Sequence, residues 1–253
     1  MVTPALRVAV LELAREAGRA TMAHYDSATS DDIRHKADQS PVTLADEAAH
    51  EILVAGLRRL DPATPVVSEE AAADSYDVRQ TWRRFWLVDP LDGTKEFIKR
   101  RAEFTVNVAL VEDGEPVFGV VLAPALDLLY WALKGGGAWR ETAAGAAERI
   151  YSTAPVPGTP LIVVESLSHP SPELEEYLRT IPVARRVKAG SSLKFCWVAE
   201  GRADIYPRLG PTMEWDVAAG DCVYRQSGRG AERTSPLTYN KPDLRNASFV
   251  IGL

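Results

Sequence analysis

The chain has 253 residues, of which 46% are hydrophobic and 25% are charged, as in ordinary globular proteins. Its formal net charge of −6 argues against nucleic-acid binding and against adhesion to an anionic membrane, since both favour a basic surface. Only two cysteines occur, Cys196 and Cys222, and their separation matches no metal-binding or redox spacing. We therefore expect reduced thiols and a cytoplasmic protein, and the sequence leaves peripheral association with the inner membrane open.

The N-terminal segment is predicted to be an amphipathic helix. Apolar residues from Leu6 to Ala17 recur at helical spacing, and Thr3 and Pro4 provide a cap and a first-turn proline. Arg7 and other charged residues interrupt the apolar run. We therefore expect neither a signal peptide nor a membrane span here, and no integral membrane contact elsewhere.

Residues 26–141 are predicted to contain one further helix and then mostly strands. In chain order the pattern indicates a polar loop or edge hairpin at 26–43, an amphipathic helix at 44–60, strands at 64–70 and 83–90 that both end in acidic residues, two strands within 104–126 joined at 112–115, and a further pair within 128–141 that turns at 135–137. The run at 85–88 is apolar throughout, which indicates a buried strand.

The character of the sequence changes after about residue 140. Residues 140–159 are small, proline-bearing and weakly periodic, which is typical of a sub-domain junction. Beyond them the pattern predicts strands at 161–166 and 203–209 and helices at 171–181, 190–201 and 213–228, the last ending at a glycine. We predict an N-terminal α+β sub-domain at 1–145 and a C-terminal α/β sub-domain at 155–253.

Acidic residues recur at the ends of predicted strands and the starts of predicted helices. Glu69 ends one strand, Asp89 and Asp92 end the next, and Asp46 and Asp216 lie near helix starts. Clustered carboxylates without histidine or cysteine favour a hard, oxygen-binding ion, Mg²⁺ or Mn²⁺, over zinc. Burying two such carboxylates close together is unfavourable unless a cation is bound beside them.

The spacing of the two aspartates in DPLDGT is informative. Pro90 restricts the chain, so that both carboxylates and the carbonyl of Leu91 can converge on one point. Gly93 permits a turn that other residues resist, and the amides of Gly93 and Thr94 begin a helix, where anions bind readily. Cations beside such amides are typical of a phosphate-hydrolysing centre.

Each acidic residue also has a purely structural interpretation. Asp46, Thr94 and Asp216 can serve as helix caps, and Glu69 beside Glu70 can be an exposed acidic pair. The joint pattern favours the catalytic interpretation, and for each residue taken singly the alternative stays open.

Four segments carry a resemblance to a known family. DPLDGTKEF and WDVAAGD resemble the two signature motifs of the inositol monophosphatase superfamily, whose members are Mg²⁺-dependent, lithium-sensitive phosphatases. KADQSPVTLAD and VVSEE resemble the two other active-site segments of that superfamily, and all four occur in the right order. The resemblance runs from about residue 5 to the C-terminal end. It implies an α/β (α+β) fold, the layered αβαβα sandwich of the inositol monophosphatase and fructose-1,6-bisphosphatase type.

Within the superfamily, LDGTKEF resembles the 3'(2'),5'-bisphosphate nucleotidases, because inositol phosphatases usually carry Asn at the position of Glu96. The segment from Gly190 to Asp216 is also similar to the bacterial nucleotidases. The resemblance implies hydrolysis of the 3'-phosphate of adenosine 3',5'-bisphosphate (PAP) to AMP and phosphate, and possible action on its sulfated form (PAPS, giving APS), in sulfur assimilation. An inositol monophosphatase or fructose-1,6-bisphosphatase, and a catalytically silent metal- or nucleotide-binding scaffold, are the alternatives.

The resemblance implies a metal-binding role for most of the acidic residues. One Mg²⁺ would be held by Glu69, Asp89 and the carbonyl of Leu91, and a second by Asp89, Asp92 and Asp216. A third, weaker ion would bind near Glu69, and Mn²⁺ is an alternative cofactor.

Catalytic roles follow from the same resemblance. Asp46 and Thr94 would polarise the attacking water, and Glu69 is counted with them as catalytic. The amides of Gly93 and Thr94 would bind the scissile phosphate, and Asp216 would also contact the substrate.

The substrate is expected to be a small nucleotide, bound by a monomer or homodimer. Gly190 and Lys194 match an element that contacts the nucleotide in the related enzymes, and His169 stands where relatives have a contacting His. Relatives usually have Arg at Leu167, so the sequence departs from their pattern beside His169. Lys194 as a solvated helix residue, His169 as a surface cap, and Arg208 as a partner of either a phosphate or a neighbouring acid are left open.

Overall fold

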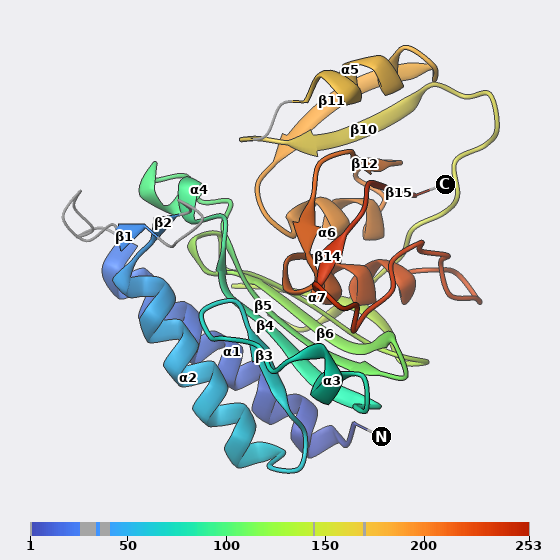
Figure 1. The fold of residues 1–253 in the computed structure, drawn as a ribbon. Coiled ribbons are helices and arrows are strands. Elements are labelled where there is room, and N and C mark those ends of the chain that lie inside the picture. Colours follow the sequence, from blue (N-terminus) through green and yellow to red (C-terminus); the bar gives the residue numbers. More distant parts are fainter. Residues whose placement is uncertain (1, 26–33, 36–40, 144, 169–170, 253) are drawn as a thin grey trace.

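A computed structural model describes residues 2–25, 34–35, 41–143, 145–168 and 171–252. Five layers follow one another across the molecule (Figure 1): helices α1 and α2, a seven-stranded sheet, helices α6 and α7, a small parallel sheet, and helix α5. This is the αβαβα sandwich that the sequence resemblance implied. The division into sub-domains at 145–155 stays a prediction.

The first layer consists of two amphipathic helices, α1 (Pro4–Tyr25) and α2 (Leu44–Leu60). Their apolar faces, including Val10 and Leu53, pack against one face of the large sheet. Thr43 caps α2 through a capping box with Asp46, which fixes where this helix begins. No helix in the described part of the chain combines the length and the apolarity that a bilayer crossing requires.

The large sheet has the strand order β3-β4-β5-β6-β7-β8-β9. Its strands are β3 (Val66–Ser68), β4 (Arg84–Asp92), β5 (Thr105–Glu112), β6 (Glu115–Ala123), β7 (Leu128–Leu133), β8 (Gly137–Thr142) and β9 (Glu148–Ile150). All neighbours are antiparallel except β3 and β4, which run parallel with Ser68 opposite Val88. In β5, Val108 belongs to the core under α1 and α2, and Ala109 to the core under α6 and α7. The sheet is therefore buried on both faces, which explains its apolar strands.

The second half of the chain builds the layers beyond the sheet. It contains β10 (Leu161–Ser166), α5 (Pro172–Leu178), β11 (Val183–Ala189), α6 (Leu193–Ala199), β12 (Tyr206–Arg208), β13 (Thr212–Met213), α7 (Glu214–Arg225), β14 (Arg245–Asn246) and β15 (Phe249–Ile251). Strands β10 and β11 pair in parallel, while β12 pairs with β15 and β13 with β14, both antiparallel. The remaining short elements are β1 (Arg34–His35), β2 (Pro41–Val42), α3 (Tyr76–Arg79), α4 (Thr94–Ile98) and the 3-10 turn η2 (Pro124–Leu126).

Some sequence-based expectations agree with the structure and others differ from it. The hairpin within 26–43 is confirmed by the antiparallel pair β1 and β2, while most of that range lies outside the described residues. Strand β9 lies inside the predicted junction and extends the sheet. The predicted helix at 213–228 runs from Glu214 to Arg225, and Gly228 beyond it forms a β-bridge with Ser152. Strand β11 was not predicted, because its outward side chains, such as Arg185 and Lys188, hide the apolar pattern.

Helix α7 lies directly on β6 because Gly119 has no side chain. A Cβ at Gly119 would stand 2.6 Å from the carbonyl oxygen of Ala219 and 2.7 Å from the Cβ of Cys222. We predict that Gly119→Ala lowers the free energy of unfolding by about 2 kcal/mol, since helix and sheet must separate to admit the methyl group. Urea denaturation measures this, and Gly210→Ala, which meets no atom within 4 Å, is the control. Equal stability of both variants would contradict the prediction.

Candidate metal centre and active site

The parallel pairing of β3 and β4 brings two acidic residues together. Ser68 lies opposite Val88, and the amide of Glu69 donates a hydrogen bond to the Val88 carbonyl at 3.1 Å. Glu69, which follows β3, and Asp89, which lies in β4 next to Val88, are therefore neighbours although 20 residues separate them in the sequence. Parallel strands end at the same edge of a sheet, so the strand order itself creates this pair.

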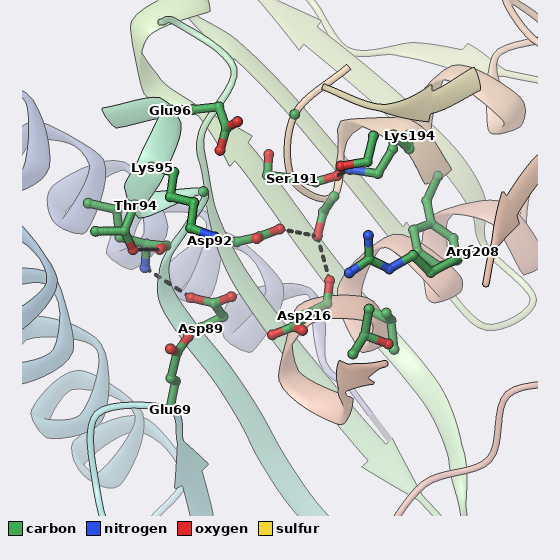
Figure 2. A pocket seen from close by; sticks show the side chains of 18 of the residues that line it. Glu69, Asp89, Asp92, Thr94, Lys95, Glu96, Ser191, Lys194, Arg208 and Asp216 are labelled. Atoms are coloured by element: carbon green, nitrogen blue, oxygen red, sulfur yellow. Dashed lines mark hydrogen bonds between the residues drawn. The ribbon is translucent and has the colours of Figure 1, made fainter. Parts of the chain in front are cut away.

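Helix α7 supplies the third carboxylate, Asp216. Glu69, Asp89 and Asp216 each offer a carboxylate oxygen, and these three oxygens lie within 4.8 Å of one another. Figure 2 shows the three side chains pointing toward a common region of the cleft. Asp89 is only 1% exposed, while Glu69 and Asp216 are half-buried and border the cleft.

Burial and mutual repulsion raise the proton affinity of the cluster. The pKa of Asp89 is raised well above its ordinary value, first by burial and then by the charges of Glu69, Asp92 and Asp216. The pKa of Asp216 is raised in the same way, by burial and then by Asp92 and Glu69. For Asp92, burial raises the pKa to about 6 although the positive charge of Lys194 lowers it. Without a cation, these groups resist ionising together.

The residues fit a divalent metal ion. Oδ1 of Asp89 accepts the amide of Leu91 at 3.1 Å, while Oδ2 is buried and meets no hydrogen-bond donor among the residues described. A buried carboxylate oxygen without a donor, facing two further carboxylates, is the arrangement that a bound cation satisfies. The donors are all oxygen, which suits Mg²⁺, Mn²⁺ or Ca²⁺ better than softer metals.

The aspartates near helix starts, Asp46 and Asp216, are capping residues, and each also has a second contact at the candidate site. Oδ2 of Asp46 accepts the Thr43 amide at 2.8 Å, and Oδ2 of Asp216 accepts the Met213 amide at 2.8 Å. Asp216 nevertheless belongs to the acidic cluster, and Asp46 also meets Thr94. The two interpretations that the sequence left open are therefore compatible, because each carboxylate has two oxygens.

Asp46 and Thr94 form the pair that the resemblance implied. The Thr94 hydroxyl lies 3.3 Å from Oδ1 of Asp46 and 3.4 Å from the carbonyl of Leu91, so it has two acceptors for its proton. Gly93 precedes Thr94 with φ at 93°, in the left-handed region that favours glycine. This turn ends β4 and starts α4, which directs Thr94 toward Asp46.

Asp92 lines the cleft but contacts a residue that the sequence analysis missed, Ser192. The Ser192 hydroxyl donates to the Asp216 carbonyl at 2.7 Å and lies 3.3 Å from Oδ2 of Asp92. Ser192 is 2% exposed, and its two contacts connect the end of β4 to the start of α7. Its position in the Gly-Ser-Ser turn before α6 was the available signal, but that turn does not reveal a partner 100 residues away.

The cleft has a volume of about 400 Å³, and Lys95, Lys194 and Arg208 also line it, the last two on the side away from Glu69 and Asp89 (Figure 2). Lys194 is 5% exposed, so the solvated alternative is wrong. Its ammonium donates to the carbonyls of Ser191 and Ala189, and lies 5.4 Å from the centre of the Tyr206 ring. Burial, reinforced by Arg208, lowers the pKa of Lys194 to about 8 against the opposing effect of Asp92.

The predicted substrate residues Gly190 and His169, and two residues without a predicted substrate role, Arg208 and Glu96, have different placements. Gly190 lines the cleft, and a Cβ there would stand 2.2 Å from the carbonyl oxygen of Glu103, so close packing also requires glycine. Arg208 lines the cleft and donates to the Pro211 carbonyl at 3.1 Å, while its Nε meets no acceptor among the described residues. Glu96 is buried and accepts a hydrogen bond from Ser168. His169 lies outside the described residues.

Comparison with known proteins identifies the class. Residues 3–247 match the inositol monophosphatase family, so the chain belongs to this family. It is similar to the 3'(2'),5'-bisphosphate nucleotidase CysQ of Escherichia coli O157:H7, with 52% identity over 247 residues that cover 96% of this chain and 98% of the relative. Among solved structures, CysQ from Bacteroides thetaiotaomicron has a TM-score of 0.79 at 40% identity and covers 96% and 95% of the two chains. An IMPase of Thermotoga maritima has a TM-score of 0.74 at 25% identity, with coverage of 89% and 84%.

The raised pKa values predict an unusual pH dependence of stability. A group whose pKa is higher in the folded than in the unfolded state loses its stabilising contribution as pH rises through the folded value, which for Asp92 is about 6. The melting temperature of EDTA-treated protein should therefore fall as pH rises from about 5 to about 7.5. Excess Mg²⁺ should weaken this fall, and Asp92→Asn should flatten part of it. A melting temperature that rises over this range in EDTA would contradict the assignment.

Proposed function

We propose that this chain is a Mg²⁺-dependent 3'(2'),5'-bisphosphate nucleotidase that removes the 3'-phosphate of adenosine 3',5'-bisphosphate. The observation that carries the proposal is a single cleft that holds the acidic cluster and, on the side away from Glu69 and Asp89, the cations Lys194 and Arg208. A substrate with two phosphates matches both sides. The relative that shares 52% identity over nearly the whole chain is named for this activity.

The metal ions in this proposal are Mg²⁺, with Mn²⁺ as a substitute. Glu69, Asp89 and the Leu91 carbonyl would hold one ion, and Asp89, Asp92 and Asp216 a second, with a weaker third position near Glu69. Bound Mg²⁺ supplies positive charge that offsets the charge on the phosphoryl oxygens in the transition state. A cytoplasmic location, and a monomer or homodimer, are part of the same proposal.

The protein groups around the scissile phosphate orient and deprotonate the attacking water. The Asp46 carboxylate accepts the Thr94 proton, which leaves a lone pair of the Thr94 hydroxyl for a proton of that water. The amides of Gly93 and Thr94 donate to phosphoryl oxygens, whose charge increases in the transition state. Asp216 and Ser192 hold the opposite wall of the cleft through their hydrogen bond at 2.7 Å.

The second phosphate of the substrate would lie near the basic side of the cleft. Lys194 and Arg208 both line it. A guanidinium group binds phosphate oxygens well. Gly190, Ser191 and His169 complete the proposed nucleotide contacts, the last by resemblance alone.

A phosphate-release panel tests substrate choice. We predict that, with Mg²⁺, kcat/KM for adenosine 3',5'-bisphosphate exceeds that for inositol 1-phosphate and for fructose 1,6-bisphosphate by about a hundredfold or more, since the correctly placed cations are worth several kcal/mol together. Preference for inositol 1-phosphate would support the alternative activity on the same scaffold. Binding of the nucleotide without phosphate release would support a silent scaffold.

Asp89 is the most buried member of the cluster and allows a direct test. Asp89→Asn should lower kcat by about a thousandfold or more, because one oxygen donor to both metal positions becomes an amide. The fold should survive, since the substitution removes a buried negative charge beside Glu69 and Asp216. Circular dichroism and phosphate release measure the two effects. Asp113→Asn, at an exposed pair with Arg83, is the matched control, and near-normal turnover of Asp89→Asn would disprove the site.

A further inference from the structure

A second buried carboxylate, Glu214, begins α7 two residues before Asp216. It is 0% exposed. Its oxygens accept the amides of Asn240 at 2.7 Å and Lys241 at 2.8 Å, and the Lys241 ammonium lies 2.8 Å from Oε1. The proposed reaction does not use this carboxylate, although a buried ionised group is costly unless it is fully paired.

The turn that holds Glu214 is itself held by a buried arginine, Arg79 at the end of α3. Arg79 is 2% exposed. Its guanidinium donates to Oδ1 of Asn240 at 2.9 Å, to the Lys241 carbonyl at 3.2 Å and to the Pro242 carbonyl at 2.9 Å. Asn240, with φ at 69°, donates a hydrogen bond in return from its side-chain Nδ2 to the Arg79 carbonyl at 2.7 Å. Arg79, Asn240, Lys241 and Glu214 are called the Arg79 clamp below.

The Arg79 clamp also reaches the segment that follows Glu69. Nε of Arg79 donates to the carbonyl of Asp74 at 2.9 Å, five residues beyond Glu69. At its other end, the amide of Met213, the residue before Glu214, donates to Oδ2 of Asp216 at 2.8 Å. The buried guanidinium of Arg79 thus connects two segments. One is the segment that follows Glu69, and the other is the turn whose amides bind Glu214 at the start of α7.

We propose that the Arg79 clamp sets the position of Asp216 relative to Glu69 and thereby tunes metal affinity. Arg79 and Glu214 act as positioning residues, since neither lines the cleft. The reason is geometric: paired buried charges hold one arrangement, and the acidic oxygens must converge within a few ångströms against their own repulsion. This inference rests on the proposed metal site.

The test is Mn²⁺ binding to the intact chain, measured by electron paramagnetic resonance without substrate, with phosphate release as a second readout. Glu214→Gln keeps the shape of the side chain but loses the charge paired with Lys241, and Arg79→Lys keeps the charge but loses the forked hydrogen bonds. Each should raise the Mn²⁺ dissociation constant about tenfold, the lower end of the effect of residues that support metal ligands. The double variant should show less than the product of the two effects, since both act through one network.

The matched control is Asp221→Asn. Asp221 is also 0% exposed on α7 and also holds segment 237–241, through a 2.8 Å hydrogen bond from Tyr239, but it lies five residues beyond Asp216. It should lower stability in urea without changing the Mn²⁺ dissociation constant by more than about twofold. If Glu214→Gln does not fold, Lys241→Met replaces it, with the same expected weakening.

The outcomes separate the two proposals. Weaker Mn²⁺ binding in the clamp variants, restored kcat at saturating Mn²⁺, and an unchanged constant in Asp221→Asn support the positioning role. Equal constants for wild type and clamp variants, or equal weakening in Asp221→Asn, overturn it while leaving the metal site intact. Failure of the wild type to bind Mn²⁺ overturns both proposals.

Discussion

Repulsion among buried carboxylates is the constraint on which the rest of this structure depends. Glu69, Asp89 and Asp216 bring their oxygens within 4.8 Å around the buried Asp89, and Asp92 adds its charge nearby. Ionised carboxylates this close are stable only if rigid elements hold them and positive charge offsets their repulsion. The parallel pair β3 and β4, the capping bond of Asp216 and the buried Lys194 each meet part of that need.

The sequence was sufficient for the fold class and for the acidic residues that line the cleft, Glu69, Asp89, Asp92 and Asp216. Local features can be predicted from the sequence alone. They include the apolar strands that end in acidic residues, the Pro-Leu pair between Asp89 and Asp92, and the glycine that follows. They placed the four acidic segments in the right elements. The layered sandwich followed from the resemblance, and the structure confirms it.

Contacts between distant segments were not predictable. Ser192 meets Asp92 across 100 residues, and Arg79 meets Asn240 across 161, and no spacing rule connects such pairs. For Lys194 the sequence left a solvated position open as an alternative, since a lysine near a helix start usually lies in solvent, but here neighbouring carbonyls and the Tyr206 ring replace water around it. For Asp46 and Asp216 the capping and active-site interpretations are compatible, because one carboxylate oxygen caps the helix while the carboxylate also contacts another candidate site residue.

The strand that pattern analysis overlooked, β11, shows what its charged side chains contribute. Among the strands described, β11 pairs only with β10, so its other edge has backbone groups available for pairing. Arg185, Arg186 and Lys188 place charged side chains along this strand, the latter two paired with Glu165, and charged side chains on an edge strand disfavour pairing with another strand. The residues that concealed the strand in the sequence therefore also discourage fibril-like stacking of one molecule on another, a protection that an apolar strand at this place would lack.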